Sequence, residues 1–117
     1  MELHFDRIED CVIVRLRGRL DRWTSGDLET RLTGELAPPL PAVALDCTKL
    51  EYVSSAGLRV LLGAAKTQRT AGRTVALFGV QPMVREVFDM SGFSDFLAIV
   101  LDEAAALAAA RSKPRDV

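Results

Sequence analysis

The sequence contains few of the residues from which catalytic and metal sites are usually built. It has one histidine, His4, and two cysteines, Cys11 and Cys47, which do not form a C-x-x-C pair. No cysteines and histidines have the spacing of metal ligands, and the phosphate loop G-x-x-x-x-G-K-[ST] is absent. The G-x-S-x-G elbow of serine hydrolases is also missing, so a Ser–His pair would require His4 to reach a distant serine. We therefore expect no enzyme activity, no catalytic residue, no metal ion and no cofactor.

Aromatic residues and unbalanced charge are scarce as well. Aromatic residues make up 6% of the chain, and the net charge is -1 with 26% charged residues. A nucleic-acid-binding domain typically carries a basic stripe with interleaved aromatics, so no nucleic-acid partner is expected. The chain opens with no signal-like segment, and no apolar run is long enough to span a bilayer. These features predict a cytoplasmic protein without direct membrane insertion, and favour buried free thiols at Cys11 and Cys47 over a disulfide.

The residues that are present suffice for one folded domain, because 117 residues with 49% hydrophobic content can bury a core without metals or disulfides. Apolar, alternating or β-branched runs predict strands over 3–6, 11–17, 42–46, 74–78 and 96–100. Helical spacing and capping residues predict helices that start at the capping-box sequence 24–27, at about 56, at 81–83 and at 103. Residues 18–21 are expected to lead out of the second strand, and 48–53 to form a loop.

The order of these elements predicts the fold class. Strands that alternate with helices require mostly parallel crossovers, and the opening pair of strands adds an antiparallel edge. We expect an α/β fold with a mixed, mostly parallel β-sheet of four to five strands and about four helices packed against it. The strand over 42–46 should be covered on both faces. A single domain is expected over 1–112, followed by a flexible C-terminal tail over 113–117.

The most informative stretch covers residues 52–62, where the chain enters the second helix. Ser54 and Ser55 stand where side-chain oxygens can accept hydrogen bonds from the first free N–H groups of the helix. The same end of the helix carries the positive pole of its dipole, which is a favourable place for an added phosphate. Two interpretations remain open: the serines only cap the helix, or one of them is a phosphorylation site.

Three motifs resemble the STAS domain of bacterial anti-sigma factor antagonists. They are Gly-Arg-Leu-Asp at 18–21, Ser-Ser-Ala-Gly-Leu at 54–58 and Phe-Asp-Met-Ser-Gly-Phe at 88–93. Their order and separation match the family, and the similarity covers nearly the whole chain. The resemblance implies a partner-switching protein that, while unmodified, binds an anti-sigma factor that is also a serine kinase of the GHKL type. It also implies that phosphorylation separates the complex and that a metal-dependent serine phosphatase restores it.

The resemblance also implies which residues carry the switch. Matching on Gly57 and the leucine after it places the phosphoacceptor on Ser55. Many relatives have aspartate before it, where this chain has Ser54, so Ser54 is a possible second site. Asp21 matches an aspartate beside the phosphoserine site and is expected to contact the partner, or else to bind N–H groups of its own turn. The complete set of expected partner-binding residues is Asp21, Trp23, Thr24, Ser54, Ala56, Gly57 and Arg59.

Several residues of this region have two interpretations. Glycine in the first turn of a helix is costly, so Gly57 allows close approach of either a partner or a neighbouring part of the domain. Trp23 is either an exposed interface anchor or a residue at the edge of the core. Arg59 faces away from the leucine side and is expected to be exposed. Met90 and Phe93 are expected to pack in or beside the core.

Two further functions stay open beside the anti-sigma factor antagonist. A STAS accessory subunit of a membrane transporter, such as a lipid-importing ABC system, would use the same face for permanent assembly, and its serine need not be modified. A small-molecule sensor would instead use a pocket near the serines.

Overall fold

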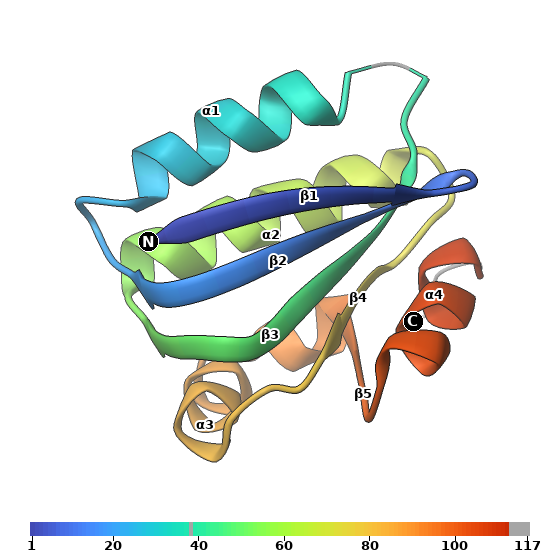
Figure 1. Cartoon of the computed structure of the whole chain (residues 1–117). Coiled ribbons are helices and arrows are strands. Elements are labelled where there is room, and N and C mark those ends of the chain that lie inside the picture. The colour runs from blue at the N-terminus through green and yellow to red at the C-terminus, as the bar shows by residue number, and fades with distance from the viewer. Residues whose placement is uncertain (38, 113–117) are drawn as a thin grey trace.

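A computed structural model describes residues 1–37 and 39–112 of the chain. Its elements are β1 (Glu2–Ile8), β2 (Cys11–Leu20), α1 (Ser25–Glu35), β3 (Ala42–Val53), α2 (Ser55–Thr70), β4 (Val75–Phe78), α3 (Pro82–Ser91), the short 3-10 helix η1 (Phe93–Phe96), β5 (Leu97–Val100) and α4 (Glu103–Arg111) (Figure 1). The five strands form one sheet in the order β1-β2-β3-β4-β5. β1 is antiparallel to β2, and the other neighbours are parallel. The predicted α/β fold and mixed sheet are confirmed, while the expected tail over 113–117 lies outside the described residues.

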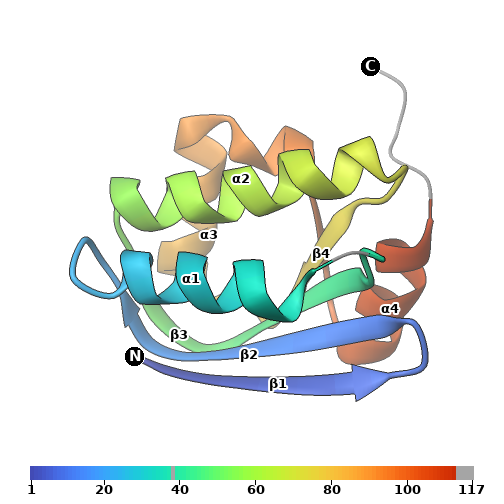
Figure 2. The same ribbon diagram turned by 90° about the horizontal axis from the view of Figure 1, so that it is seen from above.

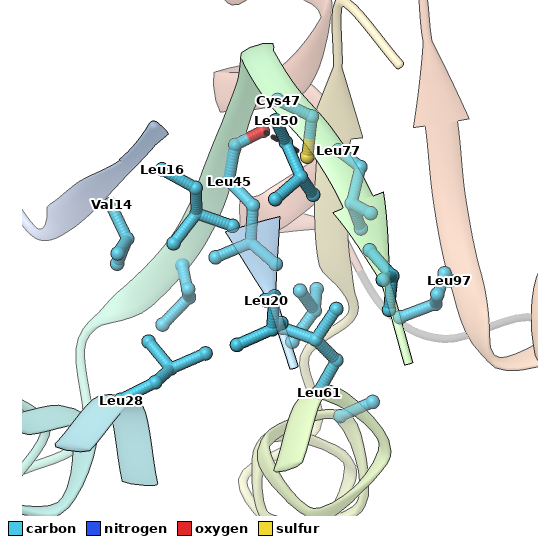
Figure 3. Packing of buried hydrophobic residues seen from close by; sticks show 14 of the residues in the cluster. Val14, Leu16, Leu20, Leu28, Leu45, Cys47, Leu50, Leu61, Leu77 and Leu97 are labelled. Carbon is cyan, nitrogen blue, oxygen red and sulfur yellow. Dashed lines mark hydrogen bonds between the residues drawn. The ribbon is translucent and has the colours of Figure 1, made fainter. Parts of the chain in front are cut away.

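Helices cover the two faces of the sheet unequally. α1, α2 and α3 lie on one face (Figure 2), where their side chains join strand residues in the larger hydrophobic cluster. Figure 3 shows Leu28 of α1 and Leu61 of α2 directed toward Leu16, Leu20 and Leu45 of the strands. The small residues of α4 pack on the opposite face in a second cluster. Both faces of the β3 segment at 42–45 are therefore buried, as its unbroken apolar run predicts.

Three strands are longer than the sequence indicated, and β1 (Glu2–Ile8) extends beyond its predicted range of 3–6 at both ends. β2 continues through Gly18, at φ +102, to Leu20, and β3 continues to Val53. The predictions of a strand exit over 18–21 and of a loop over 48–53 were therefore largely wrong. The pairing of β2 with β3 shifts register twice, and the buried residues in the second half of β3 then fall at every third position: Cys47, Leu50 and Val53. This spacing hides the two-residue period by which a strand is recognised.

The ends of the helices mostly follow their sequence signals. Gln81 precedes Pro82 at the start of α3, Gly92 ends that helix at φ 77, and the Asp102 carboxylate accepts a hydrogen bond from Ala105 N at 2.9 Å. The capping box expected at α1 does not form. Thr24 stands at the cap position, but its hydroxyl bonds elsewhere in the preceding loop.

The two cysteines are buried and unpaired with each other, which confirms the prediction of free thiols. Burial raises the pKa of both thiols, because the protein interior disfavours the thiolate. The reactive thiolate form is therefore suppressed at Cys11 and Cys47, and the thiols act as part of the packing.

Candidate functional site

The candidate site forms where β2 and β3 end side by side. The carbonyl of Leu20, the last residue of β2, accepts a hydrogen bond from Ser54 N at 2.8 Å. Arg19 and Tyr52 each lie one residue before the end of their strand. The Arg19 guanidinium lies over the Tyr52 ring, 4.2 Å from its centroid. The parallel pairing thus brings the loop before α1 and the first turn of α2 to the same end of the sheet (Figures 1 and 2).

The two serines occupy different structural positions. Ser54 is the N-cap of α2 with an extended backbone, and its hydroxyl oxygen accepts a hydrogen bond from Gly57 N at 3.2 Å. Ser55 is the first residue of the helix and is exposed. Within the described part of the chain, the Ser55 hydroxyl makes no side-chain hydrogen bond. The capping interpretation is therefore confirmed for Ser54, whereas the Ser55 hydroxyl is free to react or to contact another protein.

Asp21 organises the loop between β2 and α1. Its Oδ1 accepts hydrogen bonds from Trp23 N at 2.9 Å and Thr24 N at 3.1 Å. Desolvation raises the pKa of the Asp21 carboxyl, but these two N–H donors and the Thr24 hydroxyl outweigh it and hold the pKa below its usual value. The Thr24 hydroxyl also donates to the Arg19 carbonyl at 2.9 Å and accepts from Asp21 N at 2.9 Å. Both side chains thus fix the shape of this loop, as the turn interpretation of Asp21 predicts.

This ordered loop presents an exposed aromatic side chain. Trp23 is 78% exposed, so its interpretation as a core-edge residue was wrong. The Arg22 guanidinium lies 4.6 Å from the centroid of the indole, which restricts the tryptophan without burying it. Arg59, one turn along α2 from Ser55, is exposed as expected.

Gly57 faces the interior of the domain. It is buried, and a Cβ at this position would lie 2.6 Å from Leu20 Cγ and 3.0 Å from the Leu20 carbonyl oxygen. Close packing of α2 on the end of β2 therefore accounts for this glycine without a partner. The neighbouring Ala56 is half-buried.

At the end of α3, the expectation for Met90 was wrong, because this side chain is 81% exposed. Phe93 packs against the core as expected.

The arrangement offers an exposed surface and a hydroxyl group. Among residues 1–37 and 39–112, no three side chains of His, Cys, Asp and Glu are grouped as metal ligands. His4, on β1, contacts the Asp6 carboxylate at 2.9 Å. In the part of the chain that the structure covers, no helix combines the length and the apolar character needed to cross a membrane.

The fold and these motifs define a STAS domain. The sequence model of the STAS domain matches residues 2–106, and the chain belongs to this family. BtrV of Bordetella bronchiseptica, named as an anti-sigma factor antagonist, is 37% identical over 109 residues, which cover 93% of this chain and 94% of that protein.

Solved structures share the fold at lower sequence identity. An anti-sigma factor antagonist from Mycobacterium paratuberculosis has a TM-score of 0.83 at 20% identity, covering 95% of this chain and 94% of that chain. The Bacillus cell fate determinant SpoIIAA in its phosphorylated form has a TM-score of 0.70 at 19% identity, covering 89% and 96%.

Sequence reasoning missed the aromatic and basic groups around Ser55. Arg19 forms a cation–π pair with Tyr52, and Arg22 forms a second one with Trp23, which had been identified. An available signal was the position of Arg19 inside the Gly-Arg-Leu-Asp motif. The pairing of Arg19 with Tyr52 depends on the register of β2 and β3, which was hidden by the unrecognised second half of β3.

Proposed function

We propose that the chain is an anti-sigma factor antagonist that binds an anti-sigma factor kinase while unmodified and is released by phosphorylation at Ser55. The main observation behind the proposal is that the hydroxyl groups of the two serines have different roles. Ser54 uses its hydroxyl to cap α2, whereas Ser55 exposes its own on the adjacent surface. Membership of the STAS family and the similarity to BtrV over almost the whole chain support the antagonist function.

The docking surface we propose consists of Asp21, Trp23, Ser55, Ala56 and Arg59, and we call it the switch surface. The exposed indole of Trp23 supplies an aromatic anchor of the kind that dominates binding energy at protein interfaces. The hydrogen bonds of Asp21 hold the loop in one shape, which lowers the entropy that binding must remove. Thr24 and Ser54 support this surface, because their side-chain hydrogen bonds hold the backbone of the loop and of the first turn of α2 in place.

Three exposed arginines lie on the elements that meet near Ser55, together with the carboxylate of Asp21. Arg59 lies one turn along α2, and Arg19 and Arg22 lie on the neighbouring strand end and loop. A partner face with acidic side chains therefore complements this region. In the proposed complex the kinase presents such a face to the arginines.

A phosphate on Ser55 would reverse this complementarity without disturbing the domain. It adds about −1.5 to −2 charges at pH 7, and the helix N-terminus stabilises this charge by roughly 0.3–1 kcal/mol. Against an acidic, desolvated partner face the same charge costs roughly several kcal/mol. Because about 1.4 kcal/mol changes affinity tenfold, a penalty of this size dissolves the complex. A metal-dependent serine phosphatase would then regenerate the binding form.

The test combines the purified chain with its cognate anti-sigma factor kinase and ATP. Trypsin should release residues 50–59 as one peptide that holds both Ser54 and Ser55, and fragmentation of this peptide identifies the modified residue. We expect phosphate on Ser55, none on the Ser55→Ala variant, and normal modification of Ser54→Ala. A size-exclusion column should show that ATP releases the wild-type chain while Ser55→Ala stays bound.

Aspartate substitutions give a matched control, because they add the same charge at neighbouring positions. Ser55→Asp should weaken kinase binding at least about 100-fold. Ser54→Asp should bind within about tenfold of wild type, since aspartate can replace the serine cap. Equal binding by wild type and both variants, with no phosphorylation, would instead favour permanent assembly of the kind a transporter subunit requires.

A further inference from the structure

A cleft lies between the C-terminal halves of α1 and α2, away from Ser55 along the helix. Its volume is about 690 Å³, which falls within the range of small-molecule sites. Neither Ser54 nor Ser55 belongs to its lining, so it is not the pocket near the serines that a sensor was expected to use. The lining is mostly apolar, and its central residues are Leu32, Leu36, Leu40, Val60, Ala64 and Gln68.

Gln68 is an unusual residue to find in this cleft. It is 1% exposed and continues the buried stripe of α2 that contains Leu61 and Ala65. Within residues 1–37 and 39–112, neither its Nε2 nor its Oε1 has a hydrogen-bond partner. Buried polar groups in native proteins almost always have partners, because an unpaired one loses its bonds to water without compensation. Gln68 lines the cleft, and its buried, unpaired amide can supply an N–H donor and a carbonyl acceptor to a molecule for which the side chain becomes accessible.

The other polar residues of the cleft limit the charge of such a molecule. Thr33 Oγ1 donates to the Glu29 carbonyl at 2.9 Å, and Thr67 Oγ1 donates to the Gly63 carbonyl at 3.0 Å, so both hydroxyl protons are used within the helices. Among the described residues that line the cleft, Glu29 is the only charged one, and none is a lysine or an arginine. An anionic ligand, such as a fatty acid carboxylate, would meet a like charge and no cation.

We propose that this cleft binds a small, neutral, largely apolar molecule that carries a lactam-type amide edge. The Gln68 Nε2–H donates to the ligand carbonyl, and Gln68 Oε1 accepts the ligand N–H, which forms a reciprocal pair of hydrogen bonds. The rest of the ligand contacts the leucine and valine side chains of α1 and α2. The site is separate from the switch surface, and the proposal does not depend on phosphorylation of Ser55.

The sequence provides a clean spectroscopic readout for this proposal. The chain contains no asparagine and two glutamines, Gln68 and Gln81, so its side-chain amide NMR signals consist of two NH₂ pairs. Gln81 Nε2 donates to the Thr48 carbonyl at 3.1 Å and does not line the cleft, so its pair serves as the internal control. Gln68→Met should remove one pair and thereby assign both.

The probe is ε-caprolactam, titrated to about 50 mM to detect millimolar binding. We expect the Gln68 NH₂ signals to shift in a saturable manner while those of Gln81 stay in place. N-methylcaprolactam, which lacks the N–H, should bind at least about tenfold more weakly. The Gln68→Met variant should lose this preference between the two lactams.

A second pair of variants tests the position of the site. A Cβ at Gly63, which lines the cleft, meets nothing within 4 Å, so Gly63→Leu can fill the cleft without a backbone clash. It should weaken ε-caprolactam binding at least about tenfold. Gly34→Leu, on α1 but outside the lining, should bind like wild type. An unshifted Gln68 pair, equal shifts of both pairs, or undiminished binding by Gly63→Leu would overturn the proposal.

Discussion

The division of roles between Ser54 and Ser55 can be measured as stability before any partner is added. Ser54→Ala removes the hydroxyl oxygen that accepts a hydrogen bond from Gly57 N at 3.2 Å. Loss of a serine N-cap typically costs about 0.5–2 kcal/mol. Gly57 is buried against Leu20, so water cannot easily replace the lost acceptor, and we expect a loss of about 1–2 kcal/mol. Ser55→Ala replaces an exposed residue with a good helix former and should change the unfolding free energy by less than about 0.5 kcal/mol.

Urea denaturation followed by far-ultraviolet circular dichroism provides the assay, because the exposed Trp23 makes fluorescence a poor probe of the core. With an m-value of about 1–2 kcal/mol per molar urea, a loss of about 1–2 kcal/mol lowers the midpoint by roughly 0.5–2 M. Ser54→Asp is the control, since it keeps an acceptor and places negative charge at the helix N-terminus, and it should match or exceed wild type. If Ser55→Ala were the more destabilised alanine variant, the assignment of the cap to Ser54 would be refuted.

Three more predictions concern the packing, the exposed aromatic residue and the half-buried carboxylate of Asp46. Gly57→Ala should be less stable than Gly63→Ala by about 1–3 kcal/mol in the same urea assay, because both gain helix propensity but only the first forces a Cβ against Leu20; equal stabilities would contradict this packing. Trp23→Ala should leave the unfolding free energy within about 0.5 kcal/mol and weaken anti-sigma factor binding by about 2 kcal/mol or more in calorimetry, since the indole is exposed. At Asp46, desolvation raises the pKa, but hydrogen bonds from Thr48 and Arg15 outweigh it and hold the pKa below its usual value. The carboxylate therefore stabilises the fold above its unfolded pKa of about 3.9 and loses this effect as the pH falls further. The stability deficit of Asp46→Asn should be largest at neutral pH and shrink below about pH 4 in pH-dependent denaturation.

The arrangement of elements was predictable because local signals and the global fold agree. Asp102 caps α4, Gly92 ends α3, and the apolar run at 42–45 lies at the centre of the sheet, as their residue types indicate. The second half of β3 was not predictable, because two shifts of register leave buried residues at Cys47, Leu50 and Val53 instead of at alternate positions. A two-residue period cannot detect such a strand.

The site was predictable only where a motif or a cap defined it. Ser54, Ser55 and Asp21 follow from the family motifs and from the chemistry of helix starts, and the structure adds which oxygen binds which N–H. The exposure of Trp23 depends on which way the loop faces, and a local pattern of residues does not contain this information. Gln68 gave a signal that was overlooked, because it continues the spacing of Leu58, Leu61 and Ala65 and so predicts a buried amide.

The rigidity of the switch surface determines how a phosphate can act there. Ser54 N is tied to the Leu20 carbonyl, Gly57 packs against the Leu20 side chain, and Asp21 orders the loop that follows Leu20. Ser55 is exposed beside these contacts, and its hydroxyl takes part in none of them. A phosphate on Ser55 would therefore break none of these contacts. In the mechanism we propose, its effect arises in the complex, where the free energy of binding changes because a bound partner meets the added charge.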